Sequence, residues 1–388
     1  MEGEAKQLPS ALGAPGSGAP FSMRVWDPGV RLFHWLLVLA VGVALVTGLF
    51  GPRSRLSVHV GAGVASAGLV AFRILWGFMG STYARFSSFP VNLSAISADL
   101  AGLAVGRRSR YLGHNPLGSL MVFALLAILT LSVVTGVVTL GGVDKQGPIA
   151  FAASYVAGKA TRRVHQALAY CLLAMIFGHL LGVAYESIRG RADLVLAMMT
   201  GEKAALAADY AARPARARPI LAGLLMLLML AGAAHQILAL SARPAFGVPA
   251  GPLESTYVKE CGSCHMAYPP SLAPSSRWIA IMDGLPDHFG EDASLEPDLM
   301  SRIRTYLTKN SAEKWDTRAA DELALANPGD PLRLTATPFW TRMHRRIPET
   351  VFKSRAVGAK SACDKCHNDA STGRFDPQNI NVPEQAFQ

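Results

Sequence analysis

Two short motifs near the C-terminus carry residues that can attach haem. Both follow the pattern Cys-x-x-Cys-His, as Cys261-Gly-Ser-Cys264-His265 and Cys363-Asp-Lys-Cys366-His367. At this spacing two thiols form thioethers with the vinyl groups of one haem, while the adjacent histidine ligates its iron. A four-cysteine zinc site or a thioredoxin-like pair is the alternative, but neither explains a histidine directly after both second cysteines. The motifs therefore predict two covalently bound c-type haems.

The same C-terminal region supplies candidates for the remaining coordination positions. Besides the motif histidines His265 and His367, which are the expected proximal ligands, it contains His288 and His344. Two spare histidines for two distal positions predict six-coordinate haems that transfer electrons and do not bind a substrate at iron. Four methionines compete for these positions and would raise the potential: Met266, Met282, Met300 and Met343. The sequence leaves open which distal residue serves which haem.

The composition places these motifs in a membrane protein. Of the 388 residues 51% are hydrophobic and 16% are charged, and the mean hydropathy is +0.27. These values exclude a purely soluble, disordered or collagen-like chain. Five apolar segments approach or exceed the roughly 20 residues that a membrane-spanning helix needs: 33–50, 57–79, 118–140, 164–186 and 219–241.

The distribution of charge predicts the topology. Residues 1–248 carry 21 Lys and Arg against 9 Asp and Glu, mostly in short loops, so membrane topology explains the net charge of +10 better than nucleic-acid binding. Loops on the side of the N-terminus hold 13 Lys and Arg, and those on the other side hold 6. The positive-inside rule then predicts a cytoplasmic N-terminus and a C-terminal region on the outer side of the membrane, the side on which c-type haem is attached.

Four parts of the chain are expected from these patterns. Residues 1–22 are expected to form a flexible cytoplasmic tail without a cleavable signal peptide, and residues 23–200 a membrane domain. Residues 201–248 are expected to form a connector with the fifth spanning helix and a Pro- and Gly-rich linker, and residues 249–388 a periplasmic dihaem domain. The predicted fold class is all-α, with a four-helix di-haem core, a fifth helix and a small, mainly helical c-type domain.

Four histidines lie within or at the ends of the spanning segments, where ionisable residues are costly and mark functional sites. His179 follows His165 by 14 residues, which in a helix means a rise of about 21 Å and a rotation of about −40°. Both therefore share one face. The topology pairs His165 with His59 at the outer depth and His179 with His34 at the inner depth, which predicts two b-type haems with two histidine ligands each. Isolated packing histidines would fit any one of these positions but fit four matched depths poorly.

The roles of three other residues stay open. His114 lies in a loop and either supports a turn or contacts a quinone or a proton. His235 contacts the outer haem, a quinone or water. Arg73 either reaches the membrane surface with its long side chain or binds a haem propionate. Cys171 is expected to be a small packing hydrophobe. Three glycines beside the histidines either admit a flat macrocycle or serve helix packing: Gly61, Gly178 and Gly182.

Strings of residues in each half match known families in order and spacing. In the membrane half they are Val25-Trp-Asp27, Arg31-Leu-Phe-His34-Trp35, His59, Arg73-Ile-Leu-Trp-Gly77, His114-Asn-Pro-Leu-Gly118, His165 and His179. In the C-terminal half they are Glu260-Cys-Gly-Ser-Cys-His-Met-Ala-Tyr-Pro-Pro270, Trp278 and Asp287-His-Phe-Gly-Glu-Asp-Ala-Ser294. Residues 22–200 resemble the bacterial cytochrome b561 and Ni-Fe hydrogenase b-type cytochrome family, and residues 253–388 resemble the dihaem cytochrome c family.

The resemblance implies a four-helix core that binds haem and exchanges electrons with quinone. It also implies a bis-His carrier domain that donates to small soluble cytochromes, including an oxygen-binding haem protein. The fusion of the two modules through a fifth helix departs from the first family, and it leaves open whether a hydrogenase-type partner can dock. Fusion would hold electron donor and acceptor at a high effective concentration.

The leading functional expectation is a four-haem conduit between the quinone pool and a periplasmic cytochrome or haem protein. Quinol would be oxidised through two b haems and then two c haems, although no catalytic residue, direction or oligomeric state follows from the sequence. One alternative is a wire that passes electrons from a periplasmic dehydrogenase or hydrogenase to quinone. Another is a superoxide:quinone oxidoreductase, for which a basic funnel is expected; its candidate residues are Arg53, Arg55, Lys159, Arg162 and Arg163.

Overall fold

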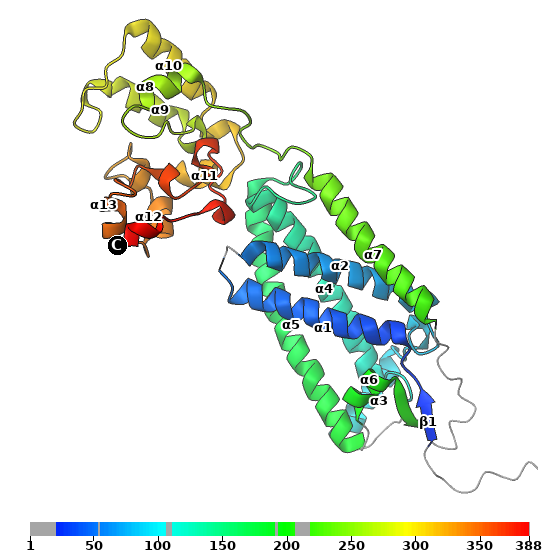
Figure 1. Ribbon diagram of the computed structural model, residues 1–388. Coiled ribbons are helices and arrows are strands. Elements are labelled where there is room, and N and C mark those ends of the chain that lie inside the picture. The colour runs from blue at the N-terminus through cyan, green and yellow to red at the C-terminus, as the bar shows by residue number, and fades with distance from the viewer. Residues whose placement is uncertain (1–20, 53–54, 106–110, 191–192, 206–217, 388) are drawn as a thin grey trace, which may run out of the picture. The chain divides into compact units, whose positions relative to one another are not determined.

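The computed structural model describes residues 21–52, 55–105, 111–190, 193–205 and 218–387, so most of the expected tail and Arg53 lie outside the described residues. Among the described residues, five helices are long and apolar enough to cross a membrane (Figure 1). They are α1 (Pro28–Leu49), α2 (Leu56–Met79), α4 (Pro116–Val143), α5 (Tyr155–Gly190) and α7 (Pro219–Ser241). The five predicted segments are confirmed as helices.

Helix α5 begins about nine residues earlier than the sequence predicts. Its first three turns carry the exposed side chains of Lys159, Arg162 and Arg163. Charged residues lower the hydropathy of a window, and so they hide this part of the helix from a search for apolar runs. Lysine and arginine are nevertheless good helix formers, and they extend the helix beyond its apolar portion.

A two-stranded ribbon departs from the all-α prediction. Strand β1 (Phe21–Arg24) pairs antiparallel with β2 (Glu202–Ala205), with Arg24 opposite Glu202. The short helix α6 (Leu194–Thr200) leads into β2 and ends at Gly201, whose positive φ of 91° favours glycine. Helix α3 (Leu93–Ala104) lies between α2 and α4 in the chain. Strands of four residues carry too little alternation to be recognised in a sequence.

The chain divides into two compact units. The first contains residues 1–39, 67–129 and 171–230, and the second contains residues 40–66, 130–170 and 231–388. The division passes through the long helices, so that the predicted inner histidine pair falls in the first unit and the predicted outer pair in the second. Both Cys-x-x-Cys-His motifs also belong to the second unit.

The C-terminal part of the second unit consists of short helices (Figure 1). They are α8 (Ser255–Cys261), α9 (Ser275–Asp283), α10 (Pro297–Lys309), α11 (Arg318–Leu323), α12 (Pro338–His344) and α13 (Glu349–Lys353). Among the described residues the 3-10 turns are η2 (Phe86–Ser88), η4 (Pro270–Leu272), η5 (Leu285–Asp287), η6 (Ala312–Lys314), η7 (Leu334–Ala336), η8 (Cys363–Lys365), η9 (Ala370–Thr372), η10 (Pro377–Asn379) and η11 (Glu384–Phe387).

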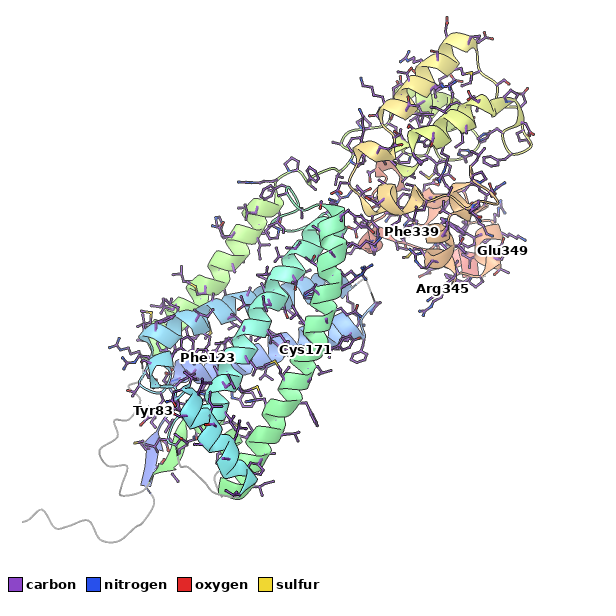
Figure 2. All side chains as sticks on the ribbon, turned by 180° about the vertical axis from the view of Figure 1, so that it is seen from behind. Tyr83, Phe123, Cys171, Phe339, Arg345 and Glu349 are labelled. Carbon is purple, nitrogen blue, oxygen red and sulfur yellow. The ribbon has the colours of Figure 1, made fainter. Side chains whose placement is uncertain are left out.

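These helices form two lobes, each with a core cluster of its own, and in a third cluster Leu272 of the first lobe packs with Ala319 and Leu323 of the second. The first lobe, residues 254–310, is centred on the buried side chains of Trp278, Met282 and Ile303. The second lobe, residues 311–387, has a core that includes Val351 and Phe352. Figure 2 labels Phe339, Arg345 and Glu349 of this second lobe. Cores this small bury little apolar surface, which suits a domain whose stability comes partly from bound groups.

Candidate haem-binding sites

His59 on α2 and His165 on α5 face each other in the second unit. Their ring centroids are 6.1 Å apart and their planes are perpendicular. Two metal–nitrogen bonds of about 2 Å and two ring radii of about 1 Å place the centroids of two imidazoles on one metal about 6 Å apart. Each Nδ1 donates a hydrogen bond to a backbone carbonyl, from His59 to Ala44 (2.9 Å) and from His165 to Ser132 (3.0 Å). These bonds fix the tautomer that leaves both Nε2 atoms free for iron.

The same local arrangement holds both rings. Thr47 on α1 has its hydroxyl 3.4 Å from His59 Nδ1, and Thr135 on α4 has its hydroxyl 3.2 Å from His165 Nδ1. In each case the carbonyl that accepts from Nδ1 lies three residues before the threonine. A glycine follows each threonine, and an added Cβ would lie 2.9 Å from His59 at Gly48 and 3.1 Å from His165 at Gly136. These residues were not predicted from the sequence, although two Thr-Gly pairs in spanning segments were a visible signal.

The three glycines that the sequence analysis singled out behave differently. An added Cβ at Gly61 or Gly182 would meet nothing within 4 Å, and one at Gly178 would meet only the end of the Met121 side chain at 3.9 Å. They therefore do not mark close contacts between helices in the described structure. A close contact of that kind occurs at Gly142 and Gly158, where the backbones of α4 and α5 approach so closely that a Cβ would lie 2.7 Å from a backbone atom.

The predicted inner pair lies in the first unit. His34 on α1 and His179 on α5 are half-buried and close enough for their charges to interact. His34 Nδ1 is buried and has no hydrogen-bond partner among the described residues. The ring of Trp35 lies edge-on to His34 with 5.0 Å between centroids. His34 and His179 belong to the same unit, and their role as a ligand pair stays a prediction.

Asp27 connects two of the strings that characterise the membrane half. Its carboxylate accepts a hydrogen bond from Val30 N (3.0 Å), which caps the start of α1. It also accepts from Trp76 Nε1 on α2 (3.2 Å) and from the hydroxyl of Ser81 (2.5 Å). Asp27 is only 1% exposed, and these donors satisfy its buried charge. The Trp-Asp and Arg-Ile-Leu-Trp strings therefore hold α1 against α2.

Arg73 is buried inside the protein and does not extend to a surface. Its residue is 3% exposed, and its guanidinium carbon lies 4.7 Å from the ring centroid of Phe86 and 5.9 Å from that of Phe89. Phe123, labelled in Figure 2, packs against both rings. Arg73 Nη1 has no hydrogen-bond partner among the described residues. A buried cationic donor of this kind suits an anionic group, as the propionate interpretation requires.

His114 is enclosed by aromatic rings. Its ring centroid lies 4.8 Å from that of Trp26 and 4.6 Å from that of Phe89. Burial, together with the nearby charges of Arg73 and Lys203, lowers the pKa of His114 to about 3. The imidazole is therefore neutral at physiological pH and does not carry protons there. Its neighbour Asn115 accepts from Gly118 N (2.7 Å) at the start of α4, which supports the turn interpretation.

In the first lobe the motif histidine pairs with a histidine 23 residues further along the chain. The ring centroids of His265 and His288 are 6.2 Å apart. His265 Nδ1 donates to the carbonyl of Met266 (2.8 Å), which again leaves Nε2 free. Met282, a competing ligand, is 2% exposed and packs in the apolar core of the lobe. Cys261 ends α8 and packs against the same core, so the motif adjoins the histidine pair.

The second lobe repeats this arrangement with the distal residue before the motif. The ring centroids of His344 and His367 are 6.1 Å apart. His344 Nδ1 donates to the carbonyl of Trp340 (2.9 Å), and the Trp340 ring stacks on His344 at 4.4 Å. Met343, the main competitor here, is 46% exposed. Each motif histidine thus faces the spare histidine of its own lobe, and the assignment of these residues as ligands stays a prediction.

The thiols of the motifs do not resemble a zinc site or a redox pair. Burial, with a smaller contribution from nearby carboxylates, raises the pKa of Cys261 to about 11 and that of Cys363 to about 12. A reactive thiol pair needs a lowered pKa, so these two thiols do not resemble one. Among the described residues no three His, Cys, Asp or Glu side chains gather as a metal cluster. Pairs of histidines beside protonated thiols fit haem attached by thioethers.

Three expectations concern residues away from these sites. His235 is exposed on α7. Cys171, labelled in Figure 2, is also exposed, so the prediction that it packs inside the protein is wrong. Lys159 pairs with Glu322 (2.5 Å) and does not contribute to an open basic funnel. The other described candidates for that funnel are exposed: Arg55, Arg162 and Arg163.

Both halves of the chain match family models. Residues 25–201 match the model of prokaryotic cytochrome b561, and residues 257–375 match that of dihaem cytochrome c. The chain joins a cytochrome b561 domain to a dihaem cytochrome c domain. The first family binds haem b and the second binds haem c, in agreement with the paired histidines and the two motifs. The chain is thus a membrane cytochrome of the electron-transfer class.

Relatives of each domain are known. The cytochrome b561 domain is 26% identical to a probable Ni/Fe-hydrogenase 1 B-type cytochrome subunit of Escherichia coli K12, over 29% of this chain and 57% of that protein. It is 31% identical to a probable Ni/Fe-hydrogenase B-type cytochrome subunit of Cupriavidus necator, over 29% of this chain and 55% of that protein. The chain therefore spans little more than half the length of these relatives.

The dihaem cytochrome c domain is similar to solved structures. It is 37% identical to a dihaem cytochrome c of Shewanella baltica OS155, covering 34% of this chain and 96% of that one, with a TM-score of 0.29. It is 34% identical to the corresponding protein from Rhodobacter sphaeroides, covering 31% and 96%, with a TM-score of 0.25.

Proposed function

We propose that this chain carries electrons across a bacterial inner membrane, between the quinone pool and a periplasmic c-type cytochrome or haem protein. The observation that carries the proposal is the repeated geometry of the histidine pairs. Three pairs have ring centroids 6.1 to 6.2 Å apart, and in each pair at least one Nδ1 donates to a backbone carbonyl. When bound between two histidines, haem supplies one-electron transfer without an open position for substrate.

The proposed ligands follow from the pairs. His34 with His179, and His59 with His165, would hold two b haems, while Arg73 offers a buried donor to a propionate in the first unit. In the C-terminal domain the two motifs would supply the thioether bonds and proximal histidines. The distal ligands would be His288 and His344. The count of two b and two c haems is part of this proposal.

The side chains around the ligands prepare them for this task. The carbonyls of Ala44 and Ser132 accept from Nδ1 and hold the rings of His59 and His165 in one orientation. Fixed ligands keep the coordination the same in both oxidation states, which reduces the reorganisation that each transfer requires. The proposed orientation has the N-terminus in the cytoplasm and the dihaem domain in the periplasm, as the distribution of Lys and Arg predicts.

Anaerobic mixing of the oxidised protein with a short-chain quinol tests the proposal. The absorption bands of b and c haem are followed separately in time. We expect the b bands to be reduced before the c bands. If the c bands are reduced first, entry of electrons through the b haems is ruled out; if quinol reduces neither set under conditions in which dithionite reduces both, quinol oxidation by this chain is ruled out.

A second function is favoured by the names of the relatives. Both are described as probable Ni/Fe-hydrogenase cytochrome subunits, so a wire that passes electrons from a separate periplasmic dehydrogenase to quinone is the alternative. This function predicts that another subunit copurifies with the chain and that the c bands respond first when its substrate is added. The quinol experiment distinguishes the two directions of electron flow, from quinol to a periplasmic acceptor or from a periplasmic donor to quinone.

A further inference from the structure

A buried lysine in the loop between α4 and α5 is paired with the dihaem domain. The Lys145 side chain is 3% exposed, and its amine donates to the carbonyl of Ala153 (3.0 Å) and forms an ion pair with Asp316 (2.5 Å). An ammonium group without water must be paired, because an isolated buried charge is very costly. Asp316 belongs to the dihaem domain, and all of these residues lie in the second unit. The loop therefore depends on the dihaem domain for its charge balance.

Asp316 also completes the start of a membrane helix. Its Oδ2 accepts a hydrogen bond from the backbone N–H of Tyr155 (2.8 Å), the first residue of α5. The first N–H groups of a helix have no partner within the helix, and the positive end of its dipole favours an anion. A capping residue normally stands next to the helix in the sequence. Ser154 provides that local cap here by accepting from Ala157 N (3.2 Å), and Asp316, 161 positions away in the sequence, adds an acceptor for Tyr155 N.

Glu322 forms a second point of attachment. Its carboxylate accepts from the hydroxyl of Tyr155 (2.8 Å) and from the amine of Lys159 (2.5 Å), and Arg342 of its own lobe lies 3.3 Å away. Tyr155 and Lys159 are one turn apart on α5. The carboxylates of Asp316 and Glu322 therefore both bind the same end of this helix. Two attachments with different partners restrict rotation as well as separation.

Further contacts extend this surface to the end of the chain. Gln146 donates to Asp376, and Gln378 donates to Gln146 (3.4 Å). At the linker, Phe246 N donates to the carbonyl of Ala150 (2.8 Å) and Asp316 N donates to that of Gly247 (2.8 Å). The linker is thereby bonded both to the loop and to the domain that follows it.

The contacting residues belong to the lobe of His344 and His367. Phe375, next to Asp376, has its ring 5.1 Å from that of His367. On the membrane side, Lys159 precedes His165 by six residues of α5, a rise of about 9 Å. The surface therefore joins the helix end nearest one histidine pair to the lobe that holds another.

We propose that the dihaem domain is docked on the α4–α5 loop through Asp316 and Glu322 and is not a freely moving tethered domain. The docked lobe is the one with His344 and His367. Resting on the proposed function, the consequence is an order of transfer: electrons pass between the His59–His165 site and the second lobe, and the first lobe with His265 and His288 exchanges them with the soluble partner. Docking itself can be tested without any electron transfer.

Zero-length cross-linking of the purified full-length protein tests docking. A carbodiimide condenses an amine with a carboxylate to an amide and takes up the released water as a urea. We expect an amide between Lys159 and Glu322, found by mass spectrometry of the digested protein. The ion pair of Lys360 with Glu349 (2.7 Å) lies within the second lobe and serves as the internal control. If the control link forms and the link to Lys159 does not, the domain is not docked as proposed.

An Asp316→Asn variant keeps the cross-linking residues and weakens the contact that positions them. We expect the Lys159–Glu322 link to decrease roughly tenfold relative to the Lys360–Glu349 link, because Lys145 loses its counter-charge. An unchanged ratio would overturn the role of Asp316. The same variant should slow reduction of the c bands after quinol mixing and leave the b bands unaffected. If quinol reduces neither protein, the proposed function fails while the cross-linking result on docking still stands.

Discussion

Replacing Gly48 by alanine tests whether the His59–His165 site depends on the space beside each ring. A Cβ at position 48 would lie 2.9 Å from His59 Cε1, which is about 0.5 Å short of the 3.4 Å at which ordinary contact begins. The imidazole must retreat by a similar amount, which is about the tolerance within which ligand geometry has to be held. It must also strain the hydrogen bond from Nδ1 to Ala44. Changes around a ligand typically reduce metal affinity about 10- to 100-fold.

We therefore expect Gly48→Ala to lose most of the b haem of this site, so that the ratio of b to c haem falls towards half. The ratio is measured from the difference spectra of the pyridine complexes of the purified protein. Gly61→Ala is the matched control, because it changes the same residue type on α2, where the added Cβ meets nothing within 4 Å. A Gly48→Ala protein with the full b-to-c ratio would refute the argument, and an equal loss in the control would show that any added methyl group disturbs the bundle.

Three further predictions concern the other sites. His179→Ala should remove one b haem and leave the covalent c haem unchanged; a full b-to-c ratio would contradict the pairing with His34. His288→Met should keep the covalent haem and raise one potential in a redox titration, because methionine ligation raises haem potentials; unchanged potentials would exclude His288 as a ligand. Docking should weaken in acid: burial alone would raise the pKa of Glu322, but hydrogen bonds from Lys159 and Tyr155 outweigh it and hold the pKa below its ordinary value. The contribution of Glu322 is then complete above the ordinary value of 4.5 and is lost as the pH falls through the lower, docked value. Amide exchange at Tyr155, corrected for its intrinsic pH dependence, should rise below pH 4.5, and a flat profile would contradict this assignment.

The residues proposed to attach haem could be predicted because the spacing between neighbouring residues of each motif indicates their chemistry. Each Cys-x-x-Cys-His motif is complete within five residues, and the membrane histidines follow from helical depth. The partners of His265 and His367 could not be decided, since both spare histidines lie 23 residues from a motif. In the folded chain each motif histidine faces the spare histidine of its own lobe. The lobe to which each spare histidine belongs depends on three-dimensional packing, which cannot be deduced from sequence spacing alone.

Other parts of the site were missed because their signals are weak or distant. The start of α5 carries charged residues whose partner Glu322 is remote in the sequence, so its polarity suggested a loop. Gly48 and Gly136 resemble ordinary small residues of membrane helices until the rings beside them are seen. The cap of α5 by Asp316 spans 161 residues, and no local rule of helix capping reaches that far. Cys171 was expected in the interior because cysteine is usually buried, but it is exposed.

The cap that Asp316 provides to α5 has a consequence for biogenesis. Helix α5 is synthesised long before Asp316 leaves the ribosome, so the N–H of Tyr155 lacks this acceptor until the dihaem domain has folded. Lys145 likewise lacks its counter-ion until then. Maturation of the membrane portion is thereby coupled to maturation of the dihaem domain, and a chain in which that domain does not fold retains an unpaired charge, a local defect, in the α4–α5 loop. Such a defect is a feature that membrane quality-control proteases could use to distinguish immature chains from finished ones.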